Sequence, residues 1–295
     1  MRCAIGGGTG LIGTACAEAA TAAGHSVIVI SRQGPTKADI GVAAAIHAAL
    51  AAARPDAVLH LAAYLQFACE QHPAEAVRVN VDGTLNVLEA CRALGIPRVV
   101  FGGSIATYGE RTDLMREDDP PSASTGLYGM TKRLGEMLGA RYSDLYGMTF
   151  ISLRYGGVFG PVEVKSSGMA LVRQRIKETA LGQDITIEGA SGNERFHLTH
   201  VTDAASATLA ALTHPKPAHR IYNVAGPAEN YLSLAQMHAA VRKLAPSAGK
   251  AIFAGQGKSA GPVDTTRLRE GLGFVPSVSV EDGLASDICK LRMDR

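Results

Sequence analysis

The chain has 295 residues with 29 Lys and Arg against 27 Asp and Glu, which gives a formal net charge of +2. This balance gives no sign of a basic surface, so we expect no nucleic-acid partner. No apolar stretch approaches the roughly 20 residues that span a bilayer, so we expect no membrane partner. The five cysteines form no close pairs of the kind that bind zinc or make a redox dithiol, which predicts a cytoplasmic protein without a metal site.

Residues 1–32 predict a strand, a glycine-rich turn, a helix and a second strand. A short apolar run leads into the turn GGGTGLIG at 6–13, and an Ala-rich segment follows. In such a turn Gly7 allows the tight bend, Gly10 lets the backbone approach a pyrophosphate, and Gly13 lets the helix pack on the sheet. The helix N-terminal amides then face the phosphates. The pattern indicates a dinucleotide site; the alternative is an ordinary strand-to-helix turn.

The end of the second predicted strand decides which dinucleotide is favoured. NAD sites place Asp or Glu there to bind the ribose 2′-hydroxyl, whereas Arg accommodates a 2′-phosphate. This chain has Ser31 and Arg32, so the sequence favours NADP, with NAD still possible. In the alternative, Arg32 is a solvated loop residue that stacks on adenine. Asp39 is placed either to accept a hydrogen bond from the adenine amino group or to cap the helix predicted at 42–53.

Further parallel strands are predicted at 57–63 and 98–104, because both segments are almost continuously apolar. The small side chains at the end of the first leave room for a pyrophosphate. The long helix predicted at 73–94 carries Asn80. Ser104 ends the second strand, and open parallel sheets bind ligands beyond the carboxyl ends of their strands. We therefore expect the Ser104 hydroxyl in the site.

Tyr128 and Lys132 are four residues apart in a helix predicted to continue to about residue 146, so both lie on one face of it. A free phenol has a pKa of about 10 and is a poor base at neutral pH. A neighbouring ammonium stabilises the phenolate and lowers that pKa, which makes Tyr128 a candidate general acid and base. The same amine could hold the nicotinamide ribose. A Tyr and a Lys four residues apart occur by chance in many helices. Here Ser104 and the glycine turn strengthen the interpretation of the pair as catalytic.

The chain as a whole resembles the extended short-chain dehydrogenases/reductases of the epimerase/dehydratase branch. The motifs that carry the resemblance are GGTGLIG at 7–13, HLAA at 60–63, NVDGT at 80–84, Ser104 through Tyr108-Gly109, Tyr128 to Lys132, LRY at 153–155, FGP at 159–161, HVTD at 200–203 and LGFVP at 272–276. It implies an α/β fold, a doubly wound parallel sheet (Rossmann fold) with a smaller C-terminal substrate lobe. We expect the Rossmann domain to comprise residues 1–160 and 199–225, and the substrate lobe residues 161–198 and 226–295. It also implies a homodimer formed through the helices that hold Asn80 and Tyr128.

The resemblance implies a Ser/Tyr/Lys triad of Ser104, Tyr128 and Lys132. In this triad Ser104 binds the substrate oxygen, and Tyr128 moves a proton while the nicotinamide takes or gives a hydride. The predicted cofactor-binding residues are Gly7, Thr9, Gly10, Leu11, Ile12, Gly13, Ser31, Arg32, Asp39, Ile40, Leu61, Ala62, Ala63, Asn80, Tyr128, Lys132, Tyr155, Gly157 and Val158. The predicted substrate-binding residues are Ser104, Ile105, Tyr128 and Arg195.

Departures from the family pattern concern the substrate. Nucleotide-sugar members usually have Asn near Gly156, and an Arg that binds diphosphate at the offset where this chain has Phe196, next to Arg195. Residues 69–73, 104–106 and 153–157 are more similar to members that act on small substrates, such as short-chain L-threonine dehydrogenases. Those members, however, usually have an acidic residue where Arg32 stands.

Three functions follow from these observations. The first is an NADP-preferring oxidoreductase that interconverts a secondary alcohol and a carbonyl on a sugar-like or small polar substrate. The second is a nucleotide-sugar epimerase or dehydratase that retains its cofactor. The third is a non-catalytic NADP sensor, which the intact Tyr128 and Lys132 pair argues against.

The C-terminal half is less regular. Helices are predicted at 169–181, 202–212, 232–244 and from 281, with strands at 184–187 and 221–224. Basic residues at 173, 175 and 177 form either an anion-binding face or a solvated one. His197 and His200 lack carboxylate neighbours with metal-ligand spacing, so we interpret them as structural or substrate-lining.

Overall fold

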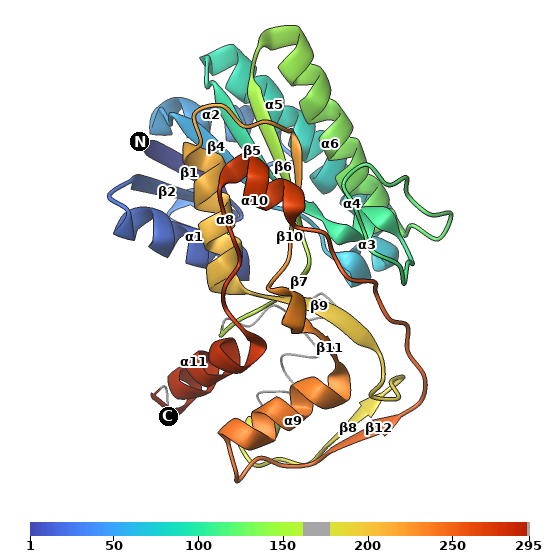
Figure 1. The fold of residues 1–295 in the computed structure, drawn as a ribbon. Coiled ribbons are helices and arrows are strands. Elements are labelled where there is room, and N and C mark those ends of the chain that lie inside the picture. The colour runs from blue at the N-terminus through green and yellow to red at the C-terminus, as the bar shows by residue number, and fades with distance from the viewer. Residues whose placement is uncertain (162–177, 294–295) are drawn as a thin grey trace.

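The computed structural model describes residues 1–161 and 178–293. In this part of the chain a sheet of seven parallel strands has the order β3-β2-β1-β4-β5-β6-β10 (Figure 1). The strands are β1 (Arg2–Gly6), β2 (Ser26–Ser31), β3 (Thr36–Lys37), β4 (Ala57–His60), β5 (Arg98–Ser104), β6 (Thr149–Tyr155) and β10 (Ile221–Val224). The direction of winding reverses between β1 and β4, which opens a crevice at the carboxyl edge of the sheet. The predicted doubly wound α/β fold is confirmed.

Helices cover both faces of this sheet because its strands are apolar on both sides. Along β1 the neighbours Ala4 and Ile5 belong to two different buried clusters, as the alternation of side chains in a strand requires. The Ile5 cluster includes side chains of α1 (Leu11–Ala22), α8 (Val201–Thr213) and α10 (Thr266–Leu272). The Ala4 cluster includes side chains of α2 (Ala43–Ala53), α5 (Gly83–Leu94) and α6 (Leu127–Tyr146).

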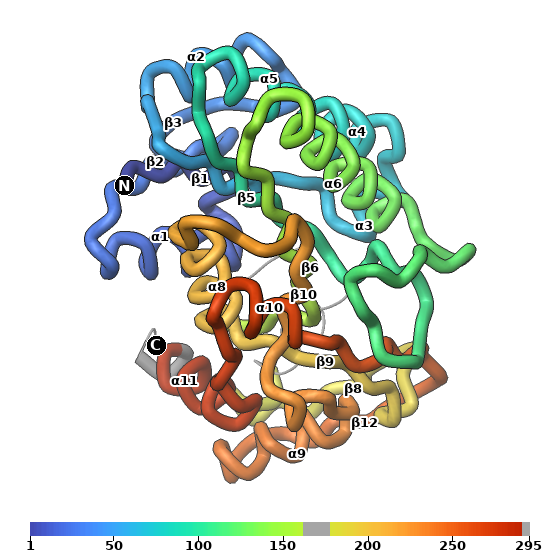
Figure 2. Tube along the Cα trace, turned by 45° about the horizontal axis from the view of Figure 1, so that its top comes forward, coloured from blue at the N-terminus to red at the C-terminus, as the bar shows by residue number. Residues whose placement is uncertain are grey.

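A smaller region lies beyond the carboxyl edge of the sheet, below it in Figure 1 and again in Figure 2. Its strands form a sheet of order β11-β9-β7 and a parallel pair of β8 and β12. These elements are β7 (Gly157–Phe159), β8 (Ile185–Glu188), β9 (Arg195–His200), β11 (Tyr231–Ser233), β12 (Ala251–Ala254), α9 (Leu234–Leu244) and α11 (Val280–Met293). A third buried cluster, which includes Phe159, Leu198, Val241 and Leu284, joins β7, β9, α9 and α11.

Some elements differ from their predicted form. The helix predicted at 73–94 is divided into α4 (Pro73–Val77), a π-helical turn at Arg78–Asp82 and α5. It is preceded by a short helix, α3 (Gln66–Gln71). The strand predicted at 57–63 ends at His60, which leaves 61–63 as a loop. The sequence places α10 in the smaller lobe, but in the structure this helix packs on the main sheet through Leu268 and Leu272.

The helix predicted at 169–181 lies mostly outside the described residues, and so do the basic side chains at 173, 175 and 177. Within the described residues no helix is long and apolar enough to cross a membrane.

Candidate active site

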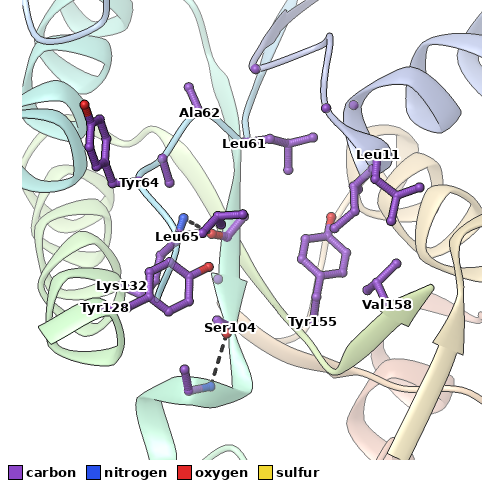
Figure 3. A pocket seen from close by; sticks show the side chains of 18 of the residues that line it. Leu11, Leu61, Ala62, Tyr64, Leu65, Ser104, Tyr128, Lys132, Tyr155 and Val158 are labelled. Atoms are coloured by element: carbon purple, nitrogen blue, oxygen red, sulfur yellow. Dashed lines mark hydrogen bonds between the residues drawn. The ribbon is translucent and has the colours of Figure 1, made fainter. Parts of the chain in front are cut away.

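A cavity of about 800 Å³ runs along the carboxyl edge of the sheet, between it and the smaller region. Figure 3 shows side chains from α1, β5, α6 and β7 around it. Its lining contains every residue that the sequence assigns to cofactor or substrate except Asn80 and Arg195. The structure therefore gathers along one cavity residues that are far apart in the chain.

The glycine turn after β1 is packed too closely for side chains. Gly7 has a φ of +83°, and a Cβ there would lie 2.6 Å from the backbone nitrogen of Ala62. A Cβ on Gly13 would collide with the carbonyl oxygen of Gly7. Gly10 precedes α1 without a side-chain cap, so the first amides of the helix are available to an anion. This cradle fits the pyrophosphate of a dinucleotide.

Arg32 lines the cavity where β2 ends, on the strand next to β1, and its side chain is exposed. Asp39 also lines it, but its carboxylate is already engaged: it accepts the Gly41 N–H at 2.8 Å and pairs with Arg78 at 3.2 Å. Burial works to raise the pKa of Asp39, yet these two partners outweigh it and the pKa is lowered. The predicted alternative, a cap for α2, is not observed, because Val42 precedes that helix.

Ser104, Tyr128 and Lys132 meet at the centre of the cavity (Figure 3). Ser104 ends β5, and its Oγ accepts the Ala106 N–H at 3.1 Å. Tyr128 lies in the first turn of α6, with Lys132 one turn further along the same face. The Lys132 Nζ donates to the carbonyl oxygen of Gly102 at 2.7 Å and lies 5.7 Å from the centre of the Tyr128 ring.

Burial has the largest effect on the pKa values of Tyr128 and Lys132. It raises the pKa of Tyr128 to about 12, although a hydrogen bond with Ser104 acts in the opposite direction. It lowers the pKa of Lys132 to about 8. The sequence predicts a lowered pKa for Tyr128 beside Lys132; the pKa is raised instead, because desolvation of the buried phenol is the largest effect on it. The Tyr128 phenol is therefore protonated at neutral pH.

Asn80 lies behind the cavity wall rather than in its lining. It is 3 % exposed, and its amide accepts the Tyr64 N–H at 2.7 Å while donating to the Tyr64 carbonyl at 3.0 Å and to Thr131 at 3.0 Å. The π-helical turn places the Asn80 side chain against this loop. Asn80 thus fixes Tyr64, which does line the cavity, to the helix that carries Lys132.

Arg195 also lies outside the cavity lining. Its guanidinium stacks on the Tyr231 ring at 4.5 Å and donates to the Tyr231 carbonyl. The next two residues, Phe196 and His197, line the cavity instead. The sequence predicts a structural or substrate-lining role for His197, and in the structure it lines the cavity and is hydrogen-bonded to Gly226 and Val263.

Other lining residues carried no sequence signal. Met115 and Ala260 come from irregular segments that meet only through the tertiary fold. Gln66 and Tyr64 follow a strand whose end was predicted three residues late. No cluster of three metal-ligating side chains occurs within residues 1–161 and 178–293.

The parallel sheet, the glycine turn and the Ser/Tyr/Lys group together define an enzyme of the extended short-chain dehydrogenase/reductase type. Residues 3–225 match the model of the NAD dependent epimerase/dehydratase family, and the chain belongs to this family. The resemblance inferred from the sequence is therefore confirmed.

The relatives described here match most of the chain. A UDP-N-acetyl-alpha-D-glucosaminuronate decarboxylase of Bacillus cytotoxicus is 28% identical over 324 residues, covering 97% of this chain and 96% of the relative. A UDP-glucuronate 4-epimerase of Thermodesulfobacterium geofontis is 29% identical over 233 residues, covering 77% of this chain and 70% of the relative. Among solved structures, the UDP-glucose 4-epimerase of Thermus thermophilus in complex with NAD is 25% identical, covers 99% of both chains and has a TM-score of 0.88.

Proposed function

We propose that this enzyme is an NADP-preferring oxidoreductase that interconverts a secondary alcohol and a carbonyl on a sugar-like or small polar substrate. The observation that carries the proposal is the convergence of Ser104, Tyr128 and Lys132 in one cavity with the glycine turn. A bound nicotinamide supplies or accepts the hydride in such a site. The protein has to orient the substrate oxygen and move its proton.

Each of the three side chains has a distinct part in this chemistry. The Ser104 Oγ accepts the Ala106 N–H and is hydrogen-bonded with Tyr128, so the two hydroxyls together can bind the substrate oxygen. Tyr128 gives its proton to that oxygen when the carbonyl is reduced and takes it back when the alcohol is oxidised. Lys132 places a positive charge beside the phenol, where it favours the phenolate that forms during reduction.

The NADP preference rests on charge at the end of β2. Arg32 is exposed on the cavity wall, and the neighbouring Ser31 offers a hydroxyl. The carboxylate of Asp39, the acidic side chain in the described lining, is paired with Arg78. A 2′-phosphate would therefore meet a free guanidinium.

A second candidate is a nucleotide-sugar epimerase or decarboxylase that keeps its cofactor bound. It is supported by the names of the relatives, which include a UDP-glucuronate 4-epimerase and a UDP-sugar decarboxylase. The same three side chains would serve it. The position of Phe196 in the cavity and of Arg195 outside it favours the first candidate.

Turnover with added cofactor separates the two candidates. Sugars, sugar nucleotides and small hydroxy compounds are incubated with NADP or NAD, and absorbance at the reduced nicotinamide band is followed. The oxidoreductase predicts stoichiometric reduction of added NADP. Conversion of a sugar nucleotide without net absorbance change, by protein that purifies with bound cofactor, would establish the second candidate instead.

We also infer a homodimer and a cytoplasmic location. Met130, Leu134 and Met137 form an exposed apolar stripe on α6, and Leu85 is exposed on α5. A dimer through these helices would bury the stripe. A Met137→Lys variant should then shift the molar mass by light scattering from two chains to one. The cytoplasmic assignment is supported by cysteines that are all free.

A further inference from the structure

The helix that carries Tyr128 begins without a cap of its own. Its N-cap residue is Gly126, which has no side chain to accept a hydrogen bond from the first amides of α6. The first N–H groups of a helix lack partners within the helix, so an uncapped first turn opens more readily than the turns that follow. Tyr128 is the second residue of that turn. Its backbone position therefore depends on what replaces the missing cap.

Glu70 of α3 supplies that cap from a different helix. Its Oε1 accepts the N–H of Leu127 at 3.1 Å, at the residue directly before Tyr128. A carboxylate at this position also meets the positive end of the dipole of α6, a helix of 20 residues. Glu70 is not among the described residues that line the cavity, and the contact that it makes is with the backbone of α6.

The neighbour of Glu70 anchors α3 itself. Cys69 is fully buried, and its Sγ donates to the Tyr64 carbonyl at 3.4 Å while accepting from the Asn80 amide at 3.6 Å. Tyr64 lines the cavity, and Asn80 lies in the π-helical turn. The carboxylate of Glu70 is therefore presented by a helix that is fixed to the cavity wall.

The peptide group on the other side of Tyr128 is also bonded. The Tyr128 carbonyl accepts from the Thr131 hydroxyl at 2.8 Å, and this hydroxyl in turn accepts from the Asn80 amide at 3.0 Å. Glu70 and Thr131 thus hold the chain directly before and directly after Tyr128. Because both bonds lead back to the same wall, the first turn of α6 is fixed relative to the cavity.

The first turn of α6 packs directly on the turn that follows Ser104. A Cβ on Gly129 would collide with the carbonyl oxygen of Ala106, so the two turns are in backbone contact. The phenol of Tyr128 is hydrogen-bonded with Ser104 beside this contact. Opening of the first turn would therefore move the phenol away from Ser104, and catalysis depends on such alignment.

We propose that Glu70 is a positioning residue for Tyr128: by capping α6 in place of Gly126, it keeps the phenol at hydrogen-bonding distance from Ser104. This inference rests on the proposed function, in which Tyr128 transfers the proton. Two variants isolate the cap. Glu70→Leu removes the acceptor at similar volume, and Glu70→Gln keeps an acceptor oxygen without the charge.

The first experiment follows amide hydrogen exchange in the protein without ligands. We expect the amides of residues 127–130 to exchange about 3- to 10-fold faster in Glu70→Leu than in the wild type, and those of 140–146 to exchange at the same rate. The matched control is Glu270→Leu, which removes an equally exposed carboxylate from α10 and should leave both segments unchanged. Equal exchange at 127–130 in Glu70→Leu and the wild type would overturn the cap, whatever compounds the enzyme turns over.

The second experiment reports on the phenol itself. 3-Fluorotyrosine replaces the 8 tyrosines of the chain, and the fluorine NMR signal of Tyr128 is assigned by its loss in Tyr128→Phe. We expect this signal to move or broaden in Glu70→Leu and to keep its position in Glu70→Gln and Glu270→Leu. An unchanged Tyr128 signal in Glu70→Leu would show that Glu70 stabilises the helix without positioning the phenol, and would overturn the proposal.

The third experiment separates positioning from cofactor binding, with the best substrate from the turnover screen. We expect kcat of Glu70→Leu to fall about 3- to 10-fold while the dissociation constant for NADPH changes less than twofold. Glu70→Gln should recover at least half of the wild-type kcat. Equal kcat in Glu70→Leu and Glu270→Leu would overturn the positioning role. If the wild type turns over no alcohol or carbonyl compound, the proposed function fails, while hydrogen exchange and the fluorine signal still decide the role of Glu70.

Discussion

Arg154 donates two hydrogen bonds to the carboxylate of Glu136, from Nε at 2.8 Å and from Nη2 at 2.7 Å. Both side chains are almost completely buried. Glu136 follows Tyr128 and Lys132 at intervals of four residues, so the three lie along one face of α6. The pair therefore ties α6 to β6 at a point one turn beyond Lys132.

Breaking this pair should destabilise the fold. In Glu136→Gln the buried guanidinium loses its counter-charge, and we expect a loss of about 3 to 5 kcal/mol in the free energy of unfolding. Urea denaturation measures it. The control is Glu270→Gln, whose exposed pair with Arg269 should change stability by less than about 1 kcal/mol. Equal stability of the two variants would show that the pair does not hold α6.

Lys132 should impose a pH dependence on carbonyl reduction. Its pKa is lowered to about 8, so the ammonium is present at pH 7 and is lost as the pH rises above 8. We expect kcat/KM in the reductive direction to fall up to tenfold per pH unit above that value. Tyr128, with a pKa near 12, stays protonated throughout and does not contribute to this change.

The variant Lys132→Arg tests the origin of this profile. Arg keeps its charge at every accessible pH, so the inflection near pH 8 should disappear even if the overall rate is lower. Lys250→Arg, at an exposed position, should retain the inflection. An unchanged inflection in Lys132→Arg would assign it to another group.

His60 should make the fold sensitive to acid. Burial lowers its pKa to about 3, against an ordinary value of 6.5. Between these values the unfolded chain binds a proton that the folded chain excludes, so stability is complete above pH 6.5 and falls as the pH decreases. The loss is about 1.4 kcal/mol per pH unit, or about 2 kcal/mol at pH 5.

Substitution of His60 should reduce this sensitivity. His60→Gln keeps a donor for Thr84, which His60 contacts through Nε2 at 3.0 Å, but it does not titrate. Urea denaturation at pH 7 and pH 5 should show a difference about 2 kcal/mol smaller in His60→Gln than in the wild type. His47→Gln, at an exposed position, serves as the control. The prediction fails if both variants lose as much stability on acidification as the wild type.

Arg32 should determine the choice between NADP and NAD. Arg32→Asp removes the charge-assisted hydrogen bond to the 2′-phosphate and adds a carboxylate that repels it. We therefore expect the NADP/NAD affinity ratio to fall about 10- to 100-fold. Fluorescence titration with the two reduced cofactors measures the ratio. Lys216→Asp makes the same charge change at an exposed position outside the cavity lining and should leave the ratio unaltered. A ratio that is also unaltered in Arg32→Asp would mean that the 2′-phosphate binds elsewhere.

The parts of this site that depend on local sequence were predictable. The glycine turn needs residues without side chains at Gly7 and Gly13, and the helical spacing alone places Tyr128 and Lys132 on one face. Ser104 follows from the rule that ligands bind at the carboxyl ends of parallel strands. The left-handed backbone at Gly7, the contact of Gly13 with Gly7 and the helical spacing involve residues that are close in sequence, and the position of Ser104 follows from the direction of one strand.

Other parts depend on contacts between distant segments. The hydrogen bond between Tyr64 and Asn80 depends on a π-helical turn, and no pattern of residues in the sequence predicts that turn. Met115 and Ala260 come together only because residues 260–264 form backbone hydrogen bonds both with the segment at 111–115 and with Arg195 of β9. The direction of the Tyr128 pKa shift also depends on burial, which the spacing to Lys132 does not reveal.

The central claim is that Tyr128 transfers the proton, and Tyr128→Phe tests it most directly. This variant removes one hydroxyl from the cavity and leaves the glycine turn and Arg32 in place. We predict that kcat falls at least about 100-fold while the dissociation constant for NADPH changes less than twofold. A kcat within threefold of the wild type, measured on the same substrate, would contradict the account.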